Sequence, residues 1–257
     1  MKKYAIVSRY DTDSKVLAQK INQSLCAHGY VEDESLPDTV FVVGGDGTFL
    51  NAVAQYFARL DQICFYGIHT GTLGFFTDYK EEEVEEFLET FYSESYKEVS
   101  YPLLKAIIDG HKYYALNEIR IENTKRTQYM DVYVDGDFFE TLRGTGVCVA
   151  SQLGSTAYNR ALGGAVIQEG LDLIEMSEIA GIHHSKYRSL GAPIVMKRDV
   201  KIKLVSDSFE DAIIGYDSKI DTLDGVKEIQ IEVCRERKVR MLRGKDVSYF
   251  KRLQSLF

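Results

Sequence analysis

The hydrophobic pattern of this chain changes near residue 100, and the change predicts two kinds of structure in one protein. Residues 4–8, 39–43 and 63–68 are short apolar runs typical of buried strands, and helical patterns separate them. Strands that alternate with helices predict a parallel sheet with helices on both faces. We therefore expect an α/β domain over residues 1–100.

Three helices are expected in this first domain. The first is capped by Asp13 and ends near Gly29, the second begins at Phe49, and the third follows Asp78. Each repeats apolar residues at helical spacing, which predicts one face packed on the sheet. These faces are Leu17, Ile21 and Leu25 in the first helix, Leu50, Val53, Ala54 and Phe57 in the second, and Val84, Phe87, Leu88 and Phe91 in the third.

From residue 101 to about 239 the pattern is mainly that of strands, which predicts a sandwich or a closed sheet. Asp135-Gly136 between two apolar runs is a strong signal for a tight hairpin. Residues 171–180 form the main exception, because their pattern predicts a helix. The tail, residues 240–257, again contains a helical pattern, and we expect it to pack on the first domain.

Composition excludes several classes of protein. The net charge is −8, whereas proteins that bind nucleic acid non-specifically usually carry a basic surface. The chain shows no signal peptide and no apolar stretch long enough for a bilayer. Its four cysteines are scattered, and adjacent His183 and His184 point in different directions, so we expect reduced thiols and no metal held by the protein. A cytoplasmic protein without nucleic-acid or membrane partners is expected.

The glycine turn, residues 44–48, reads Gly-Gly-Asp-Gly-Thr and lies between a predicted strand and a predicted helix. Glycines let the backbone turn sharply and approach a ligand closely. A helix start adds unpaired N–H groups and partial positive charge, which suit phosphate. Asp46 does not suit phosphate, because a carboxylate repels it. Two interpretations are open: Asp46 is a base for a hydroxyl that attacks phosphate, or a solvated helix cap.

Three further segments are dense in small and polar residues: residues 71–76, Asn117-Glu118, and residues 154–159 followed by Gly163-Gly164. Each alone is explained by a turn or an exposed loop. The chain has no Gly-x-x-x-x-Gly-Lys-Ser/Thr loop. Gly144-Thr145-Gly146 runs into three apolar residues, so the dinucleotide fingerprint Gly-x-Gly-x-x-Gly fails as well.

Together, and in this order, the segments resemble the bacterial NAD kinase family over nearly the whole chain. The glycine turn alone is shared with diacylglycerol and related lipid kinases. Asn117-Glu118 and the Gly-Ser-Thr-Ala-Tyr segment are much more specific to NAD kinases. The matching residues are 44–48, 71–75, Asn117-Glu118, Arg143-Gly144, 154–158, Gly163-Gly164 and 187–193.

The resemblance implies a two-domain fold of the NAD kinase/diacylglycerol kinase-like type. It implies an enzyme that phosphorylates the 2′-hydroxyl of the adenosine ribose of NAD to give NADP. The donor would be ATP with a divalent cation such as Mg²⁺, or inorganic polyphosphate. The family also forms tetramers in which residues 178–182 complete a neighbouring NAD site, so a homotetramer or homodimer is implied. A plain amphipathic core is the alternative interpretation of those residues.

The resemblance assigns a role to each matching position. Asp46 would orient or deprotonate the attacking hydroxyl, while Asn117 and Glu118 would hold ribose hydroxyls, since a carboxylate accepts from two vicinal OH groups. Gly44, Gly45, Gly47, Thr48 and Arg143 would bind the donor phosphates, and the remaining NAD-binding residues would be Phe75, Thr145, Thr156, Ala157, Tyr158, Ala180 and Asp217.

The sequence departs from the family pattern around the acceptor pocket. Family members commonly carry an aspartate at the position of Thr145, where it helps to hold the nicotinamide end. Residues 150–153 replace a Ser-Thr-Pro-Thr segment, and Ala161 replaces a serine. We expect a working kinase with weaker NAD affinity or a changed preference between NAD and NADH. A lipid kinase and a dinucleotide-binding protein that has lost catalysis are the alternatives; Asn117-Glu118 argues against the first, and Asp46 against the second.

Overall fold

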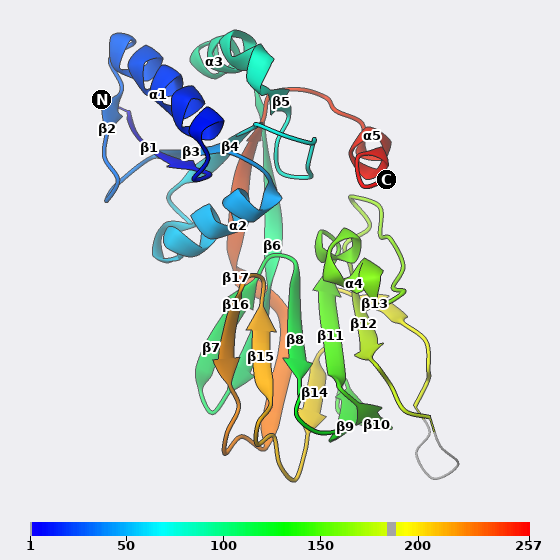
Figure 1. Ribbon diagram of the computed structural model, residues 1–257. Coiled ribbons are helices and arrows are strands. Elements are labelled where there is room, and N and C mark those ends of the chain that lie inside the picture. Colours follow the sequence, from blue (N-terminus) through cyan, green and yellow to red (C-terminus); the bar gives the residue numbers. More distant parts are fainter. Residues whose placement is uncertain (1, 184–188) are drawn as a thin grey trace. The chain divides into compact units, whose positions relative to one another are not determined.

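The computed structural model describes residues 2–183 and 189–257. The chain divides into an α/β unit, which contains the residues up to Tyr101 and those from Arg237 onward, and a β unit, Pro102–Glu236. Two long strands, β6 (Lys97–Ile108) and β17 (Glu228–Arg243), have residues in both units (Figure 1). The α/β first part and the mainly-β second part are those that the change in hydrophobic pattern predicts.

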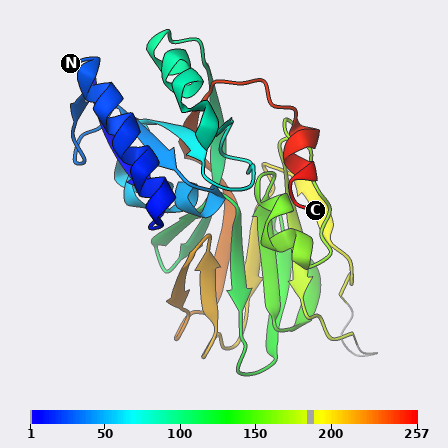
Figure 2. The same cartoon turned by 45° about the horizontal axis from the view of Figure 1, so that its top comes forward.

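Parallel strands form the centre of the α/β unit. The order β4-β3-β1-β2 consists of parallel pairs, so the predicted parallel sheet is confirmed. Helices α1 and α3 cover the face that carries Phe41 and Tyr66, whereas α2 covers the other face through the contact of Phe49 with Phe65 (Figures 1 and 2). The elements are β1 (Lys3–Ser8), α1 (Thr12–Ala27), β2 (Val31–Glu32), β3 (Thr39–Val43), α2 (Asp46–Gln55), η1 (Phe57–Arg59), β4 (Cys64–His69), β5 (Tyr79–Lys80), η2 (Glu81–Glu83), α3 (Val84–Tyr92) and α5 (Tyr249–Gln254).

Two helices of this unit begin earlier than the sequence pattern predicts. The N-cap of α1 is Asp11 rather than Asp13, because the Asp11 Oδ1 atom accepts a hydrogen bond from the Ser14 N–H at 2.9 Å. Helix α2 begins at Asp46 rather than Phe49, so part of the glycine turn is already helical. Helices α1 and α3 bury their predicted faces, whereas α2 buries Thr48, Phe49, Ala52 and Val53, and only Val53 belongs to its predicted face.

Two sheets pack face to face in the β unit. One has the order β13-β12-β11-β8-β15-β16, and the other contains β10-β9-β14-β17 with β6 and β7. Ile121 and Val149 of the first sheet share one core with Val132 and Leu204 of the second. The remaining bounds are β7 (His111–Ala115), β8 (Glu118–Glu122), β9 (Gln128–Val134), β10 (Asp137–Gly144), β11 (Gly146–Ser151), η3 (Gly154–Thr156), α4 (Tyr158–Ala161), β12 (Leu173–Ile179), β13 (Ile194–Lys197), β14 (Ile202–Val205), β15 (Ile213–Tyr216) and β16 (Lys219–Thr222).

The helix predicted over residues 171–180 is wrong, because this segment is strand β12. The strand pairs with β11 on one side and β13 on the other. Ile174 and Met176 enter the core, while Glu175 and Ser177 face the opposite side and bind the Asn159 amide there. A period of two therefore governs the segment, and buried hydrogen-bond partners explain its polar positions.

The hairpin predicted at Asp135-Gly136 is confirmed. These two residues join antiparallel strands β9 and β10 and have φ angles of +52° and +93°. Both angles lie in the left-handed region that a type I′ turn requires, and asparagine, aspartate and glycine tolerate it best.

Candidate active site

The glycine turn lies where the order of the parallel sheet reverses. From β1 the chain first adds β2 on one side and then β3 on the other, so the gap between the ends of β1 and β3 is a topological switch point. Ligands of open α/β sheets bind outside the carboxyl ends of strands at such points. Gly44 follows β3 there, with a φ of +150°, and a Cβ atom on Gly44 would collide with the Thr48 side chain. The turn therefore requires a glycine at its first position.

The Asp46 carboxylate is fixed by the loop between β4 and β5, residues 70–78, which we call the β4–β5 loop. Its Oδ2 and Oδ1 atoms accept hydrogen bonds from the backbone N–H groups of Phe75 at 3.0 Å and Phe76 at 3.1 Å. Asp46 makes no cap hydrogen bond to its own helix, and Gly45 occupies the N-cap position. A Cβ atom on Gly74 would collide with this carboxylate. Asp46 is therefore a carboxylate oriented by another part of the unit, not a solvated cap.

Asn117 and Glu118 lie at the start of β8, where two other segments of the β unit meet them. The Asp217 carboxylate accepts hydrogen bonds from the N–H groups of Leu116 and Asn117, both at 2.8 Å. Gly154 approaches so closely that a Cβ atom there would collide with the Asn117 carbonyl. The structure thus brings Asn117, Glu118, Asp217 and the segment of residues 154–158 together within one unit.

Two acceptor atoms in this cluster are buried without a hydrogen-bond partner, Asn117 Oδ1 and Glu118 Oε2. Such orphaned acceptors are costly unless a ligand or water supplies a donor. Burial raises the pKa of the Glu118 carboxyl to about 7, and the neighbouring negative charge of Asp217 adds to this rise. A polar acceptor pair with a perturbed pKa is typical of a binding or catalytic site.

Strand β8 carries two more charged residues on the same face as Glu118, which the sequence prediction missed. The Arg120 guanidinium lies 4.6 Å from the centre of the Tyr158 ring and 3.3 Å from Glu122 Oε1. The Tyr158 hydroxyl donates a hydrogen bond to the same Glu122 oxygen at 3.1 Å. Charges at every second position of residues 118–122 were the available signal, since such residues share one face of a strand. Short helix α4, which begins at Tyr158, lies next to the end of β11 in both views (Figures 1 and 2).

Three predicted residues lie further along the β unit. Thr145 joins β10 and β11, and its N–H donates to the Ile179 carbonyl at 2.9 Å, which brings it beside Ala180 at the end of β12. Arg143, predicted near phosphate, has its guanidinium 5.2 Å from the centre of the Tyr129 ring on the neighbouring strand. Tyr187 and Arg188, which belong to the family-like segment 187–193, lie outside the described residues.

Phe75 and Thr156 differ in their surroundings. Phe75 belongs to the α/β unit, where its ring is buried 6.0 Å from the centre of the Tyr249 ring, besides its N–H bond to Asp46. Thr156 belongs to the β unit, where its hydroxyl donates to the Leu153 carbonyl at 3.1 Å. Apart from Arg143, Thr145 and Ala180, the predicted site residues therefore form two groups, one in each unit: the glycine turn with Phe75, and the β8 cluster with residues 154–158.

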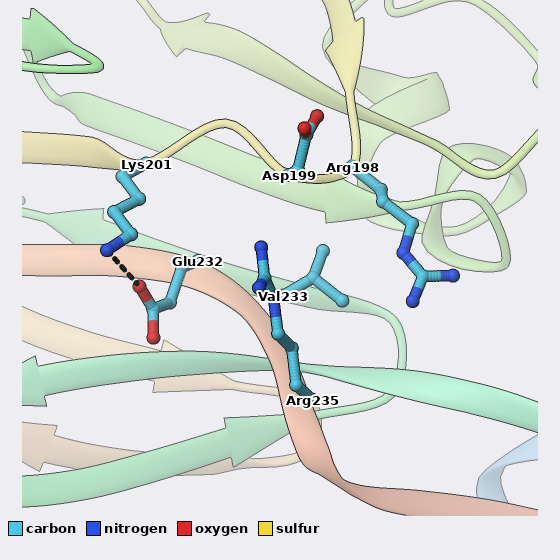
Figure 3. A pocket seen from close by; sticks show the side chains of 6 residues that line it. All are labelled: Arg198, Asp199, Lys201, Glu232, Val233 and Arg235. Carbon is cyan, nitrogen blue, oxygen red and sulfur yellow. Dashed lines mark ion pairs between the residues drawn. The ribbon is translucent and has the colours of Figure 1, made fainter.

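A cavity of about 180 Å³ beside β14 and β17 contains none of the predicted site residues (Figure 3). Its charges are mostly paired: Arg198 bonds Asp172 at 2.6 Å, and Glu232 contacts Lys105 at 2.9 Å and Lys201 at 3.9 Å. We assign it no role in the reaction. The residues that line it are Arg198, Asp199, Lys201, Glu232, Val233 and Arg235.

Neither a metal centre nor a membrane span is evident in the described ranges. Within residues 2–183 and 189–257, no group of three or more His, Cys, Asp or Glu side chains could hold a metal ion. No helix in the same ranges is both long enough and apolar enough to cross a membrane. An oriented carboxylate at a glycine turn and a set of buried acceptor atoms are features typical of an enzyme active site.

Comparison with known proteins gives the family of this enzyme. The ATP-NAD kinase N-terminal domain matches residues 7–96, and the ATP-NAD kinase C-terminal domain matches residues 116–243. NAD kinase 1 of Bacillus anthracis is 37% identical over 261 residues, which cover 99% of this chain and 98% of that protein. The NAD kinase of Geobacillus stearothermophilus is 38% identical over 260 residues, which cover 99% and 96%. The chain belongs to the NAD kinase family, and the enzyme is an NAD kinase.

Solved structures show the same fold. The yeast NADH kinase complexed with NADH aligns with a TM-score of 0.84 at 17% identity and covers 100% of this chain and 86% of that one. The NAD kinase from Archaeoglobus fulgidus in complex with ATP aligns with a TM-score of 0.80 at 24% identity, over 98% and 99%. The two-unit architecture is therefore that of NAD kinases.

Proposed function

We propose that this NAD kinase transfers a terminal phosphoryl group to the 2′-hydroxyl of the adenosine ribose of NAD, with Asp46 as the acceptor of the hydroxyl proton. The observation that carries the proposal is the oriented Asp46 carboxylate within the glycine turn. Two backbone N–H groups use one lone pair on each oxygen, so each oxygen keeps a further lone pair for the substrate hydroxyl. The O–P bond forms as the bond to the leaving phosphate breaks, and the proton passes to Asp46.

The acceptor ribose is proposed to bind at Asn117 and Glu118. Both side chains have a buried oxygen without a partner, and ribose hydroxyls are donors of matching chemistry. Asp217 holds the backbone of this pair, so its proposed role is to position the two side chains. Tyr158, Ala157 and Thr156 supply apolar and aromatic area beside the pair for a base of the dinucleotide. Phe75 is proposed as a further NAD-binding residue.

The donor is proposed to be ATP or polyphosphate, whose phosphates approach Gly44, Gly45, Gly47 and Thr48. The α2 N-terminus supplies N–H groups and partial positive charge for this. A Mg²⁺ ion fits the proposal as part of the donor, because Mg²⁺ is commonly held by substrate phosphates, water and only one or two carboxylates. Bound in that way, it would neutralise phosphate charge during the transfer.

The NAD site is also proposed to depend on Thr145, Ala180 and a neighbouring subunit in a homodimer or homotetramer in the cytoplasm. Thr145 lacks the charge of the aspartate common in the family, which supports weaker binding of the nicotinamide end. Thr145→Asp should tighten NAD binding, measured by titration calorimetry, and Thr145→Ser serves as the uncharged control. Equal affinities for the wild type and Thr145→Asp contradict this assignment.

The decisive experiment couples NADP formation to an NADP-specific dehydrogenase. The protein is incubated with NAD, Mg²⁺ and either ATP or polyphosphate, and the two donors are compared in parallel. Asp46→Ala should lower kcat by about 10²- to 10⁴-fold, the usual contribution of a positioned base. An unchanged kcat in Asp46→Ala rules out the proposed role, and binding of NAD without turnover in the wild type would mean that catalysis has been lost.

A further inference from the structure

The side chains of Arg243, Arg252 and Ser255 bind carbonyl oxygens of the β4–β5 loop. Arg252 Nη1 donates to the carbonyl oxygens of Gly74 at 3.1 Å and Thr77 at 2.5 Å. Arg243 Nη2 donates to the Phe75 carbonyl at 2.8 Å, and the Ser255 hydroxyl donates to the Leu73 carbonyl at 2.6 Å. The loop that orients Asp46 is thus held by side chains from β17 and α5.

Peptide planarity connects these contacts to Asp46. The Gly74 carbonyl and the Phe75 N–H belong to one planar peptide unit, and in the trans form they point in opposite directions. Arg252 holds the carbonyl end of this unit and Asp46 Oδ2 receives its N–H end. The next peptide unit repeats the arrangement, with Arg243 on the Phe75 carbonyl and Asp46 Oδ1 on the Phe76 N–H. Each arginine therefore orients one of the two donors that fix Asp46.

Charge and burial make this arrangement rigid. The Arg252 side chain is only 4% exposed, and it pairs with the Asp78 carboxylate, which is 2% exposed. Asp78 also pairs with Arg243 at 3.0 Å and accepts the Gly244 N–H at 3.0 Å. A positive charge on a carbonyl oxygen polarises the peptide unit and strengthens its N–H as a donor. Arg252, which is buried, and Arg243, whose side chain is 11% exposed, thus share one aspartate and bind the loop carbonyls with their remaining N–H groups.

We propose that Arg252 and Arg243 are positioning residues for Asp46: they fix, through two peptide units of the β4–β5 loop, the orientation of the carboxylate in the reaction. This inference rests on the proposed role of Asp46. It gives helix α5, at the end of the chain, a part in phosphoryl transfer without contact with the substrates.

Arg252→Lys tests the inference, because lysine keeps the positive charge beside Asp78 but cannot bind two carbonyls and a carboxylate as a planar fork. We expect kcat to fall about 10-fold or more, as small misplacements of catalytic groups do, with KM values for NAD and ATP changed less than about threefold. The Phe75 and Phe76 amide protons should also exchange faster with solvent. Lys251→Gln is the matched control, because Lys251 is an exposed residue on the same helix.

A double-mutant cycle with Asp46→Asn separates positioning from a general structural role. If Arg252 acts through Asp46, Arg252→Lys should lower the residual kcat of Asp46→Asn by less than about twofold. An equal fold loss in both backgrounds overturns the inference, and so does a kcat loss that matches the loss of folded protein in thermal unfolding. Unchanged kcat and amide exchange in Arg252→Lys overturn it as well. The proposed function fails by a different result, full NADP formation by Asp46→Asn.

Discussion

At the scale of single residues, Gly74 determines whether Asp46 can take its observed position. The glycine has no Cβ atom, and this absence leaves the space that the Asp46 carboxylate occupies against the Phe75 and Phe76 N–H groups. A methyl group at this position must displace either the carboxylate or the loop. The position of the Asp46 carboxylate therefore depends on a residue that carries no side chain.

Gly74→Ala should lower kcat by about 10- to 100-fold, because a shift of the order of 1 Å in a reacting group has effects of that size. Gly71→Ala is the control in the same loop, since a Cβ atom at position 71 meets nothing within 4 Å. The kcat of steady-state NADP formation and the temperature of thermal unfolding are compared between the two variants. Equal kcat values in the two variants would show that the carboxylate tolerates the displacement.

The proposed role of Glu118 predicts that the affinity for NAD depends on pH. Its pKa is raised to about 7 by burial and by the Asp217 charge, so the carboxyl is protonated in mild acid and ionised above neutrality. In the proposed NAD site, the ionised form would accept hydrogen bonds from two ribose hydroxyls. NAD affinity should therefore rise between about pH 6 and pH 8, and Glu118→Gln should bind NAD about 10- to 100-fold more weakly with no such rise. Titration calorimetry at several pH values tests this, and a flat profile for the wild type contradicts it.

The raised pKa of Glu118 also predicts how the free energy of unfolding changes with pH. A carboxyl whose pKa is raised in the folded state binds more protons folded than unfolded, so its contribution to stability is present in acid and lost as pH rises from about 4.5 to about 7. The loss amounts to about 3 kcal/mol at most. Glu118→Gln should therefore unfold at a higher temperature than the wild type at pH 8, and at a similar one at pH 4. Calorimetry that finds the variant less stable at pH 8 would rule out this explanation.

At the scale of elements, strand β8 carries both Glu118 and Arg120, and the positive charge of Arg120 lowers the pKa of the Glu118 carboxyl. Arg120 is opposite Gly215 in β15, and a Cβ atom on Gly215 would come within 2.8 Å of its guanidinium. The positive charge of Arg120 counters the rise in the pKa of Glu118. The missing side chain at position 215 thus makes room for the charge that limits the rise in the pKa of Glu118.

Arg120→Gln should raise the pKa of Glu118 further and move the rise in NAD affinity upward by about one pH unit, the lower end of the effect of a nearby opposite charge. Arg198→Gln removes the same charge from another part of the β unit, where Arg198 pairs with Asp172. It should leave the profile unchanged. The prediction fails if the two variants give the same pH dependence of NAD affinity.

Elements were predictable where one pattern determined their packing. Helix α3 buries the four residues that its spacing predicts, because a single apolar face packs on the sheet. Strand β12 was misassigned as a helix because Glu175 and Ser177 are buried on Asn159, a partner that is remote in sequence. The glycine turn could be found from the sequence because its pattern is local. The contacts of Arg252 could not be found, because its partners are remote in sequence. Its importance comes from carbonyls of Gly74 and Thr77 almost two hundred residues earlier in the chain.

At the scale of the whole molecule, the two groups of site residues belong to two units, and each group has its own chemistry. Asp46 and the glycine turn belong to the α/β unit, while Asn117, Glu118 and Asp217 belong to the β unit.

Single substitutions should therefore separate binding of NAD from transfer of the phosphoryl group. Asp46→Asn should keep NAD affinity within about threefold and lose most of kcat, because it removes an acceptor of the reacting proton. Glu118→Gln should raise the Kd for NAD but leave the affinity for ATP unchanged. Calorimetric titration of both variants with NAD and with ATP, beside kcat, tests the separation, and Lys251→Gln controls for charge removal outside both groups. If Glu118→Gln weakens the binding of ATP as strongly as the binding of NAD, the effect of Glu118 is not specific to NAD, and this prediction is wrong.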